Sequence, residues 1–229
     1  VLMAGGMGTR LMPLTENTPK PMLKVGDKPI LHIIVNKFKE CGYTNFVMCL
    51  NYKSKVIQDY FGDGKKFGVK IEYIVEEQRM GTAGALSLLN DKLKEPFFVM
   101  NGDLLTNLDF EKMLDFHIKC ESKATMCVRG YNIEIPYGEV KLENEKLLSI
   151  VEKPVHKIFV NAGIYILEPE CIDLIPRQFY DMTLLFKKLI LNKKKTISFP
   201  LGEYWLDIGM SKDYEKAKSE YNSIFDDSN

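Results

Sequence analysis

The sequence has no excess of charge of either sign. Lysine and arginine together number 31, aspartate and glutamate also number 31, and the formal net charge at pH 7 is zero. Proteins that bind nucleic acid or anionic membranes usually carry a basic patch or a surplus of positive charge. No apolar run approaches the ~20 residues that cross a bilayer as a helix. We therefore expect neither nucleic acid nor a membrane as a partner.

Histidine and cysteine are also scarce. The histidines His32, His117 and His156 are isolated from one another, so the sequence offers no strong candidate for a general base or a nucleophile. The cysteines are an odd number and lack the short paired spacing of zinc or redox motifs. They are Cys41, Cys49, Cys120, Cys127 and Cys171. We expect reduced, mostly buried thiols and a cytoplasmic protein.

Apolar residues make up 45% of the chain, enough to form a core. Short β-rich runs alternate with longer runs of helical periodicity, a pattern typical of βαβ units around a largely parallel sheet. The strand-like runs are Val1–Ala4, Asn45–Leu50, Lys70–Val75, Pro96–Met100, Ala124–Val128, Gly163–Leu167 and Thr196–Pro200. The helix-like runs are Pro29–Cys41, Ser54–Phe61, Thr82–Leu89, Phe110–Cys120, Met182–Leu191 and Ser211–Ser223. Gly42 is placed to end the first helix at C′.

The pattern predicts one domain over residues 1–229. Near Tyr137 it changes, and Gly138–Leu142 and Leu147–Val151 alternate like a hairpin, so we expect a subregion around residues 130–170 that covers one face of the sheet. The tail, residues 226–229, should fray. The chain starts inside a strand-like run, so we expect no signal peptide and a natural protein that extends further at the N-terminus.

A glycine-rich loop follows the first strand, running Gly5-Gly6-Met7-Gly8-Thr9-Arg10-Leu11. Glycines here let backbone N–H groups approach an anion, as in a phosphate-binding loop. No Gly-Lys-Ser/Thr ends the loop, and Leu11 stands where a dinucleotide fingerprint has its third glycine, so neither of those motifs is present. Arg10 and Lys20 add two cations that can hold phosphate oxygens.

Two aspartates stand out as candidate functional residues. Asp103 follows the apolar run Phe97–Met100 and should lie at the carboxyl end of a central strand, where open α/β sheets bind ligands. It could instead cap the segment that follows. Asp207 is a polar residue inside the apolar stretch Trp205–Gly209, where a carboxylate needs a partner.

The chain resembles the sugar nucleotidylyltransferase family over nearly its whole length. The resemblance begins with GGMGTRLMPLTENTPKPML (residues 5–23) followed by KPIL, and further motifs occur in the same order. These are Gly81–Ala85, Asn101–Asp103, Pro136–Gly138, Glu152–Pro154, Asn161–Tyr165 and Tyr204–Gly209. The resemblance implies a three-layer, Rossmann-like α/β fold with a mixed, mostly parallel sheet of the nucleotide-diphospho-sugar transferase type. It also implies transfer of a nucleotidyl group from a nucleoside triphosphate to a sugar 1-phosphate, with release of pyrophosphate.

The resemblance further implies roles for individual residues. The glycine loop wraps the triphosphate, Arg10 holds the β and γ groups, Lys20 lies beside the α-phosphate, and Asp103 and Asp207 hold Mg²⁺ between the two substrates. The nucleotide-binding residues by this resemblance are Leu2, Ala4, Gly5, Gly6, Gly8, Thr9, Glu76, Gly81, Thr82, Asn101 and Gly102. Catalysis then rests on positioning and charge neutralisation by Mg²⁺, Lys20, Arg10 and Lys153.

The sugar side is also assigned by resemblance. Glu152 accepts hydrogen bonds from sugar hydroxyls, Lys153 binds the sugar phosphate, and Gly138 and Asn161 line the same pocket. Tyr137 is either a sugar contact or a packing residue. The expected substrate is a hexose- or hexosamine-1-phosphate, used for surface glycan or glycoconjugate biosynthesis.

The base is predicted from Glu76 or its neighbour Glu77. Uridylyl- and thymidylyltransferases that the chain resembles commonly carry Gln here, whose amide can both donate and accept. An ionised Glu only accepts, which suits the adjacent N1–H and N2 amino donors of guanine. GTP is therefore favoured, with UTP or dTTP as the alternative.

The sequence is also compatible with other functions. The chain could be a non-catalytic regulatory subunit that keeps the nucleotide pocket, although Arg10, Lys20 and Asp103 are intact. It could be a cytidylyltransferase for choline phosphate, although Glu152–Pro154 and Asn161–Gly163 favour a sugar. A homo-oligomer is left open. Some similar proteins carry regulatory cystathionine-β-synthase-type domains ahead of the catalytic one, an arrangement compatible with the expected N-terminal extension.

Overall fold

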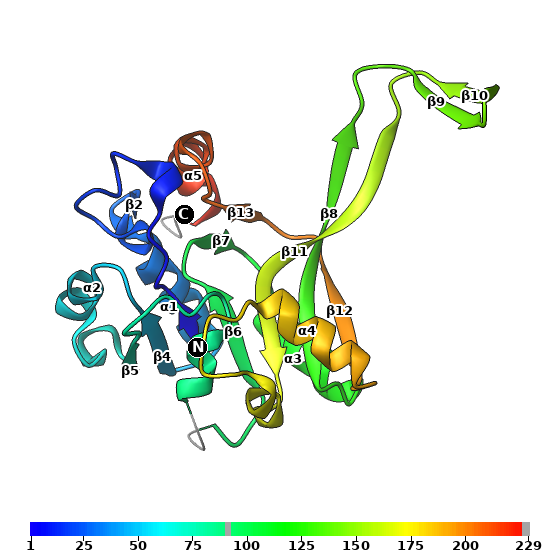
Figure 1. Cartoon of the computed structure of the whole chain (residues 1–229). Helices are drawn as coiled ribbons and strands as arrows, with labels where there is room; N and C mark the ends of the chain where they lie inside the picture. Colours follow the sequence, from blue (N-terminus) through cyan, green and yellow to red (C-terminus); the bar gives the residue numbers. More distant parts are fainter. Residues whose placement is uncertain (90–92, 226–229) are drawn as a thin grey trace.

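A seven-stranded mixed sheet forms the centre of the protein, in the order β12-β8-β11-β6-β1-β4-β5 (Figure 1). The computed structural model describes residues 1–89 and 93–225. Strand β11 runs antiparallel to both of its neighbours, and the other neighbouring pairs are parallel. The predicted mixed, mostly parallel sheet is therefore confirmed. The strands are β1 (Leu2–Met3), β4 (Asn45–Leu50), β5 (Lys70–Val75), β6 (Phe97–Asn101), β8 (Ala124–Glu134), β11 (Val155–Leu167) and β12 (Thr196–Leu201).

Helices cover both faces of the sheet, which confirms the three layers. The helices on one face are α1 (Ile30–Glu40), α2 (Ser54–Phe61), α3 (Phe110–Lys119) and α5 (Ser211–Ile224), and their buried residues share one hydrophobic cluster. On the other face, α4 (Met182–Leu191) packs in a second cluster. Strand β6 contributes side chains to both clusters. Phe98 and Met100 belong to the first cluster, and Phe97 and Val99 belong to the second. This alternation explains why the run is continuously apolar.

Most predicted elements are confirmed. The strands Asn45–Leu50 and Lys70–Val75 agree residue for residue, and Gly42 follows α1 with φ of 81°. The predicted helix at Thr82–Leu89 is wrong, because the segment forms a short 3-10 helix, η4 (Gly84–Leu88). Its start is bonded to another segment: the N–H groups of Ala83 and Gly84 both donate to the carbonyl of Tyr180. The tail expected to fray, residues 226–229, lies outside the described residues.

Strands β8 and β11 continue beyond the sheet as a two-stranded arm, tipped by the hairpin of β9 (Glu139–Glu143) and β10 (Lys146–Val151) (Figure 1). We call residues 130–160 the arm. The predicted hairpin is confirmed. Its predicted place over one face of the sheet is wrong, because all residues of β9 and β10 are exposed. Beyond a register shift between Asn161 and Tyr165, the β8–β11 ladder continues to the pair Glu134–Val155 and carries the hairpin away from the body.

Two small antiparallel pairs complete the fold. Strand β2 (Lys24–Val25) pairs with β3 (Lys28–Pro29), and β7 (Leu104–Thr106) pairs with β13 (Trp205–Asp207). The second pair joins segments about a hundred residues apart and sets Asp207 opposite Leu104. No helix within the described residues combines the length and the apolar character that a membrane span requires.

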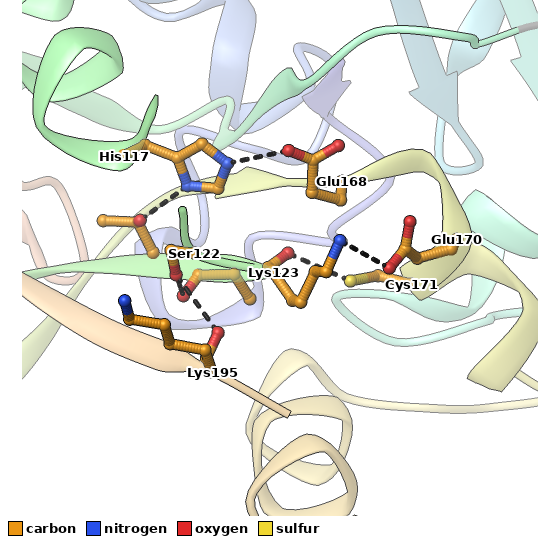
Figure 2. Close-up of polar contacts among 9 residues, drawn as sticks. His117, Ser122, Lys123, Glu168, Glu170, Cys171 and Lys195 are labelled. Carbon is orange, nitrogen blue, oxygen red and sulfur yellow. Dashed lines mark hydrogen bonds and ion pairs between the residues drawn. The ribbon is translucent and has the colours of Figure 1, made fainter. Parts of the chain in front are cut away.

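A cluster of polar side chains, which includes His117, Lys123, Glu168 and Glu170, lies at the end of β8 that is remote from the arm (Figure 2). His117, fully buried, places Nδ1 2.7 Å from Oγ1 of Thr125 and Nε2 3.5 Å from Oε1 of Glu168. Burial lowers the pKa of His117, and the facing Glu168 opposes that shift. Lys123 pairs with Glu170 at 2.9 Å. The cluster ties the ends of α3, β8 and β11 together and lies outside the cavities described below.

Candidate active site

Two adjoining cavities open where β1 and β6 end, at the carboxyl edge of the sheet. The first encloses about 160 Å³ and the second about 280 Å³, and they share Thr82, Asn101 and Asp181 in their walls. Open α/β sheets bind ligands at this edge. A larger cavity, of about 910 Å³, lies at the opposite edge beside Val1 and Leu93. Among the predicted site residues, all of which are described, only Leu2 lines that larger cavity, so the predicted chemistry gathers elsewhere.

Most of the predicted nucleotide-binding residues line the first cavity. They are Ala4, Gly5, Gly6, Glu76, Gly81, Thr82, Asn101 and Gly102, and the cavity also includes the catalytic candidate Lys20 and the metal-ligand candidate Asp103. Leu2 is buried in the sheet beneath the loop, whereas Thr9 and Arg10 are exposed on the short 3-10 helix η1 (Thr9–Leu11) that follows it.

The glycine loop packs closely against neighbouring segments of the chain. Gly8 has φ of 64°, and a Cβ there would lie 2.9 Å from Cγ2 of Thr15, so a larger residue would meet both strain and a clash. The Thr15 hydroxyl donates to the Gly8 carbonyl at 2.9 Å. A Cβ on Gly5 would lie 3.2 Å from both Asn51 and Oε1 of Glu76. The loop is therefore held against the segments that follow β4 and β5.

Lys20 lies between the two aspartates. Its Nζ forms an ion pair with Oδ2 of Asp103 and lies 3.7 Å from Oδ1 of Asp207. Lys20 itself is only 7% exposed. Asp103 follows β6 by two residues, which confirms its predicted place at a strand end. Asp207 reaches it through the β7–β13 pair, in which the N–H of Ile208 donates to the carbonyl of Asp103.

The ionised form of Asp207 is destabilised by a second carboxylate nearby. Burial raises the pKa of Asp207, and the nearby Asp103 carboxylate raises it further, while Lys20 and Arg10 act in the opposite direction. The side chain of Arg10 extends from its exposed helix into this region. Its Nη1 lies 3.6 Å from the position that a Cβ on Gly209 would occupy. Additional positive charge beside the two carboxylates would therefore stabilise their ionised forms.

Asp103 and Asp207 fit a hard divalent cation such as Mg²⁺. Both supply carboxylate oxygens, and their mutual repulsion is relieved by a cation. Within residues 1–89 and 93–225, no group of three or more His, Cys, Asp or Glu side chains gathers as a metal site. A bound ion would therefore take its other ligands from substrate phosphate and water, as Mg²⁺ commonly does.

Glu76, rather than Glu77, faces the first cavity. Glu76 is 7% exposed, whereas Glu77 lies on the surface. Oε2 of Glu76 accepts the Met80 N–H at 3.0 Å, and Oε1 lies beside Gly5. Burial raises the pKa of Glu76, against the opposing effects of the Met80 N–H and Arg79. The cavity therefore contains a buried acceptor next to the glycine loop.

The second cavity contains Asn161, Asp207 and several residues that were not among the predicted site residues. Asn161 Nδ2 donates to the Tyr165 hydroxyl at 2.6 Å, and its Oδ1 accepts the Gly163 N–H at 2.9 Å. Asp181 and Trp205 also line this cavity, as does Asp207. Asp181 directly precedes α4 and has the sequence signal of a helix cap, but its carboxylate instead accepts from Thr82.

The remaining predicted sugar residues lie on the arm. Gly138 and Glu152 are neighbours, since a Cβ on Gly138 would lie 3.2 Å from Oε2 of Glu152. Tyr137, Glu152 and Lys153 are exposed, and Lys153 has φ of 44°. Neither cavity has any of these four residues in its wall. The structure therefore does not bring Lys153 together with Lys20 and the aspartates within one chain.

The chain is similar to known proteins over most of its length. The chain is 36% identical over 225 residues to a probable mannose-1-phosphate guanylyltransferase 1 of rice, Oryza sativa subsp. japonica, covering 93% of the chain and 62% of that relative. It is 34% identical over 223 residues to the mannose-1-phosphate guanyltransferase of Saccharomyces cerevisiae, with the same coverage.

Among solved structures, HddC from Yersinia pseudotuberculosis complexed with GMP-PN is 28% identical, with a TM-score of 0.73, over 96% of this chain and 97% of that one. The chain spans 62% of the length of the rice and Saccharomyces cerevisiae relatives. The family described as nucleotidyl transferase matches residues 1–224, and the chain belongs to this family.

Proposed function

We propose that this protein transfers a nucleotidyl group from a nucleoside triphosphate, preferentially GTP, to a hexose- or hexosamine-1-phosphate. The products are a nucleotide sugar and pyrophosphate, for the synthesis of surface glycans or other glycoconjugates. The observation that carries the proposal is the convergence of buried Lys20 with Asp103 and Asp207 at the edge of a glycine-loop cavity.

The reaction needs neutralisation and alignment of two anions. An oxygen of the sugar phosphate attacks the α-phosphorus in line, a new P–O bond forms, and the bond to the β-phosphate oxygen breaks as pyrophosphate leaves. Both reactants are anionic, so the cations Lys20, Arg10 and Lys153 lower the cost of bringing them together. No side-chain nucleophile is required. The buried thiols of Cys49, Cys127 and Cys171 fit this, because burial raises the pKa of each to about 12.

We assign a Mg²⁺ site to Asp103 and Asp207. Members of this family typically use a divalent metal. When bound, the ion supplies positive charge to the phosphate oxygens that face the two carboxylates. The ammonium of Lys20 stands between these carboxylates and offsets part of their negative charge.

GTP is favoured by Glu76 together with the comparisons. The buried carboxylate offers Oε1 as an acceptor beside the glycine loop. Guanine presents N1–H and its N2 amino group side by side, whereas the pyrimidine of UTP or dTTP lacks that donor pair. The relatives named above are called guanylyltransferases, and HddC was solved with GMP-PN.

The partners we propose are therefore the nucleoside triphosphate and the sugar phosphate, without nucleic acid or membrane. A reducing compartment such as the cytoplasm suits the cysteines, all of which are free. The mannose-1-phosphate named for the relatives makes a hexose phosphate the first acceptor to test.

Pyrophosphate release tests the proposal directly. The protein is incubated with Mg²⁺, one of GTP, UTP, dTTP or CTP, and one of mannose-1-phosphate, glucose-1-phosphate, glucosamine-1-phosphate or choline phosphate. Release with GTP and a sugar phosphate supports the proposal. Equal release with UTP or dTTP contradicts the choice of base, and release with CTP and choline phosphate alone contradicts the sugar. Tight nucleotide binding without any release identifies a regulatory subunit instead.

A further inference from the structure

The single tryptophan of the chain, Trp205, lies in the wall of the second cavity. Its backbone belongs to β13 and is paired with Thr106 of β7. Its side chain is half-buried, and Nε1 donates to the Ala162 carbonyl at 2.8 Å. One hydrogen bond fixes one atom of the indole and not the plane of the ring, because the χ2 torsion of tryptophan is broad. A second contact is therefore needed to orient the ring.

Arg129 supplies a contact to this ring from outside the cavity. Its guanidinium carbon lies 5.9 Å from the centroid of the Trp205 ring, within the range of a cation–π interaction. Its Nη1 donates to the Glu203 carbonyl at 2.7 Å. Arg129 is in the wall of neither the first nor the second cavity. It thus contacts the indole without being placed to touch a ligand in either cavity.

The backbone of Arg129 is fixed on both sides. It pairs with Leu201 of β12 and with Val160 of β11, and in the described part of the chain it is the last residue of β8 that has both partners. Strands β8, β11, β12 and β13 approach one another here, at the base of the arm (Figure 1). A side chain that starts from a doubly paired strand is a rigid support for a neighbouring ring.

The carbonyl that accepts from Trp205 belongs to a bulge of β11 that shapes the second cavity. The β8–β11 register shifts between Asn161 and Tyr165, on either side of Ala162 and Gly163. The Asn161 side chain accepts from the N–H of Gly163 and donates to the Tyr165 hydroxyl. All four residues of this bulge line the cavity. Any movement of the indole is therefore transmitted to the cavity wall through the Ala162 carbonyl.

The partners of Arg129 suit the orientation of a ring. Among the described residues, its guanidinium contacts a backbone carbonyl and an aromatic side chain rather than a carboxylate. A guanidinium is planar and weakly hydrated, so it can contact an aromatic ring while its N–H groups donate to an oxygen. The bond to the Glu203 carbonyl fixes the guanidinium two residues before Trp205. The charge of Arg129 is thus directed at the indole.

We propose that Arg129 is a positioning residue for the sugar phosphate. It holds the Trp205 indole against the Ala162 carbonyl and so keeps the second cavity in the shape that accepts the sugar. It acts through Trp205 and not on the reacting phosphates. The place of the sugar in this cavity rests on the proposed function, whereas the hold of Arg129 on the indole does not.

Steady-state kinetics of Arg129→Ala test the effect on the sugar. We expect the KM for the sugar phosphate to rise about three- to tenfold, from the loss of a cation–π contact and a hydrogen bond. The kcat and the KM for the nucleotide should be little changed, because Arg129 lies outside both cavities. Arg129→Lys keeps a cation but loses the planar fork, so its KM should be intermediate. Lys119→Ala, which removes an exposed cation at the end of α3, is the control.

An unchanged KM for the sugar phosphate in Arg129→Ala overturns the proposal. An equal rise in Lys119→Ala overturns it too, since any lost surface cation would then have the same effect. A fall in kcat without a rise in this KM places Arg129 at the reacting centre instead of behind the cavity wall, and also contradicts the proposal.

The fluorescence of Trp205 tests the positioning without substrates, because no other tryptophan contributes. We expect the acrylamide quenching constant of Arg129→Ala to rise and its fluorescence anisotropy to fall, since one contact to the ring is lost. Circular dichroism verifies that the variant is folded. Equal quenching and anisotropy in the two proteins overturn the proposal. If the wild type turns over no sugar phosphate, the proposed function and the role in sugar binding are both contradicted, while increased quenching still supports the hold of Arg129 on the indole.

Discussion

Oδ1 of Asp181 accepts hydrogen bonds from both the backbone N–H and the hydroxyl of Thr82, at 3.0 and 3.1 Å. The same hydroxyl accepts the N–H of Met182, so Thr82 takes the capping role at α4 that Asp181 leaves. Both residues stand in the wall between the two cavities. This contact therefore fixes the geometry of the substrate region and not only the start of a helix.

Replacing Asp181 by alanine should disturb both cavities together. We expect the KM values for the nucleotide and the sugar phosphate to rise together, with a loss of stability of about 1 kcal/mol from the missing hydrogen bonds. Steady-state kinetics and urea unfolding measure the two effects. Asp173→Ala, at an exposed aspartate, is the control. Unchanged KM values would show that the contact serves only the fold.

Removing either metal-ligand candidate should abolish most turnover. We expect Asp103→Asn and Asp207→Asn each to lower kcat by at least ~10²-fold, because a transition-state charge loses its stabilisation. Mn²⁺ binding in the presence of GTP should weaken in parallel. Asp115→Asn, at an exposed position on α3, should change neither quantity. Near-normal turnover in Asp103→Asn would contradict the metal assignment.

Lys20→Met should lower kcat more than it raises the KM for the nucleotide. Negative charge grows around the α-phosphate during bond exchange, so a cation beside it acts mainly on the transition state. The expected loss in kcat is on the order of 10²-fold. Lys24→Met, four residues away and exposed, provides the comparison. A variant impaired only in nucleotide binding would place Lys20 outside the reacting centre.

Glu76→Gln should erode the preference for GTP. In the wild-type protein, UTP offers no such donors to Oε1 of the buried carboxylate, and an unsatisfied charged group costs more than the ~1–3 kcal/mol of a neutral one, so at least about tenfold discrimination is expected. The ratio of kcat/KM values for GTP and UTP measures it. Glu77→Gln is the matched control at the neighbouring exposed position. If Glu77→Gln alone changed the ratio, the base contact would belong to Glu77.

The pH dependence of stability should depend on His117. Its pKa in the folded protein is lowered by burial, so below the ordinary histidine pKa of ~6.5 the unfolded chain binds more protons than the native one. The stabilisation is fully present above that pH and is lost as the pH falls. The urea midpoint should therefore drop between about pH 7.5 and about pH 5.5, and drop less in His117→Gln.

His32 must be separated from this effect. Burial also lowers the pKa of His32, and Lys28 lowers it further, so His32 acts in the same direction. The double variant His117→Gln with His32→Gln should show the weakest pH dependence of the set. A pH dependence equal to that of the wild type in His117→Gln would place the proton uptake outside the cluster shown in Figure 2.

Local patterns in the sequence were enough to predict most of the helices and strands and most of the residues that line the first cavity. Strands such as Lys70–Val75 and helices such as Ser54–Phe61 are set by local periodicity, and their bounds were predicted correctly. The glycine loop follows β1 and Asp103 follows β6 along the chain, so parallel neighbouring strands bring them to one edge of the sheet. Each of these residues directly follows its own strand, and a hydrophobic period of two or 3.6 residues is enough to predict the strands and helices themselves.

The contacts between segments that are distant in the sequence depend on tertiary packing. Asp207 reaches Lys20 because β13 pairs with β7 in one register, and Asp181 meets Thr82 across 99 residues. At the base of the arm, the bulge around Gly163 packs against Trp205 and Asn101. Local pattern carries no information on such contacts, since register, bulge direction and cavity lining are set by which surfaces bury against each other once the chain has closed.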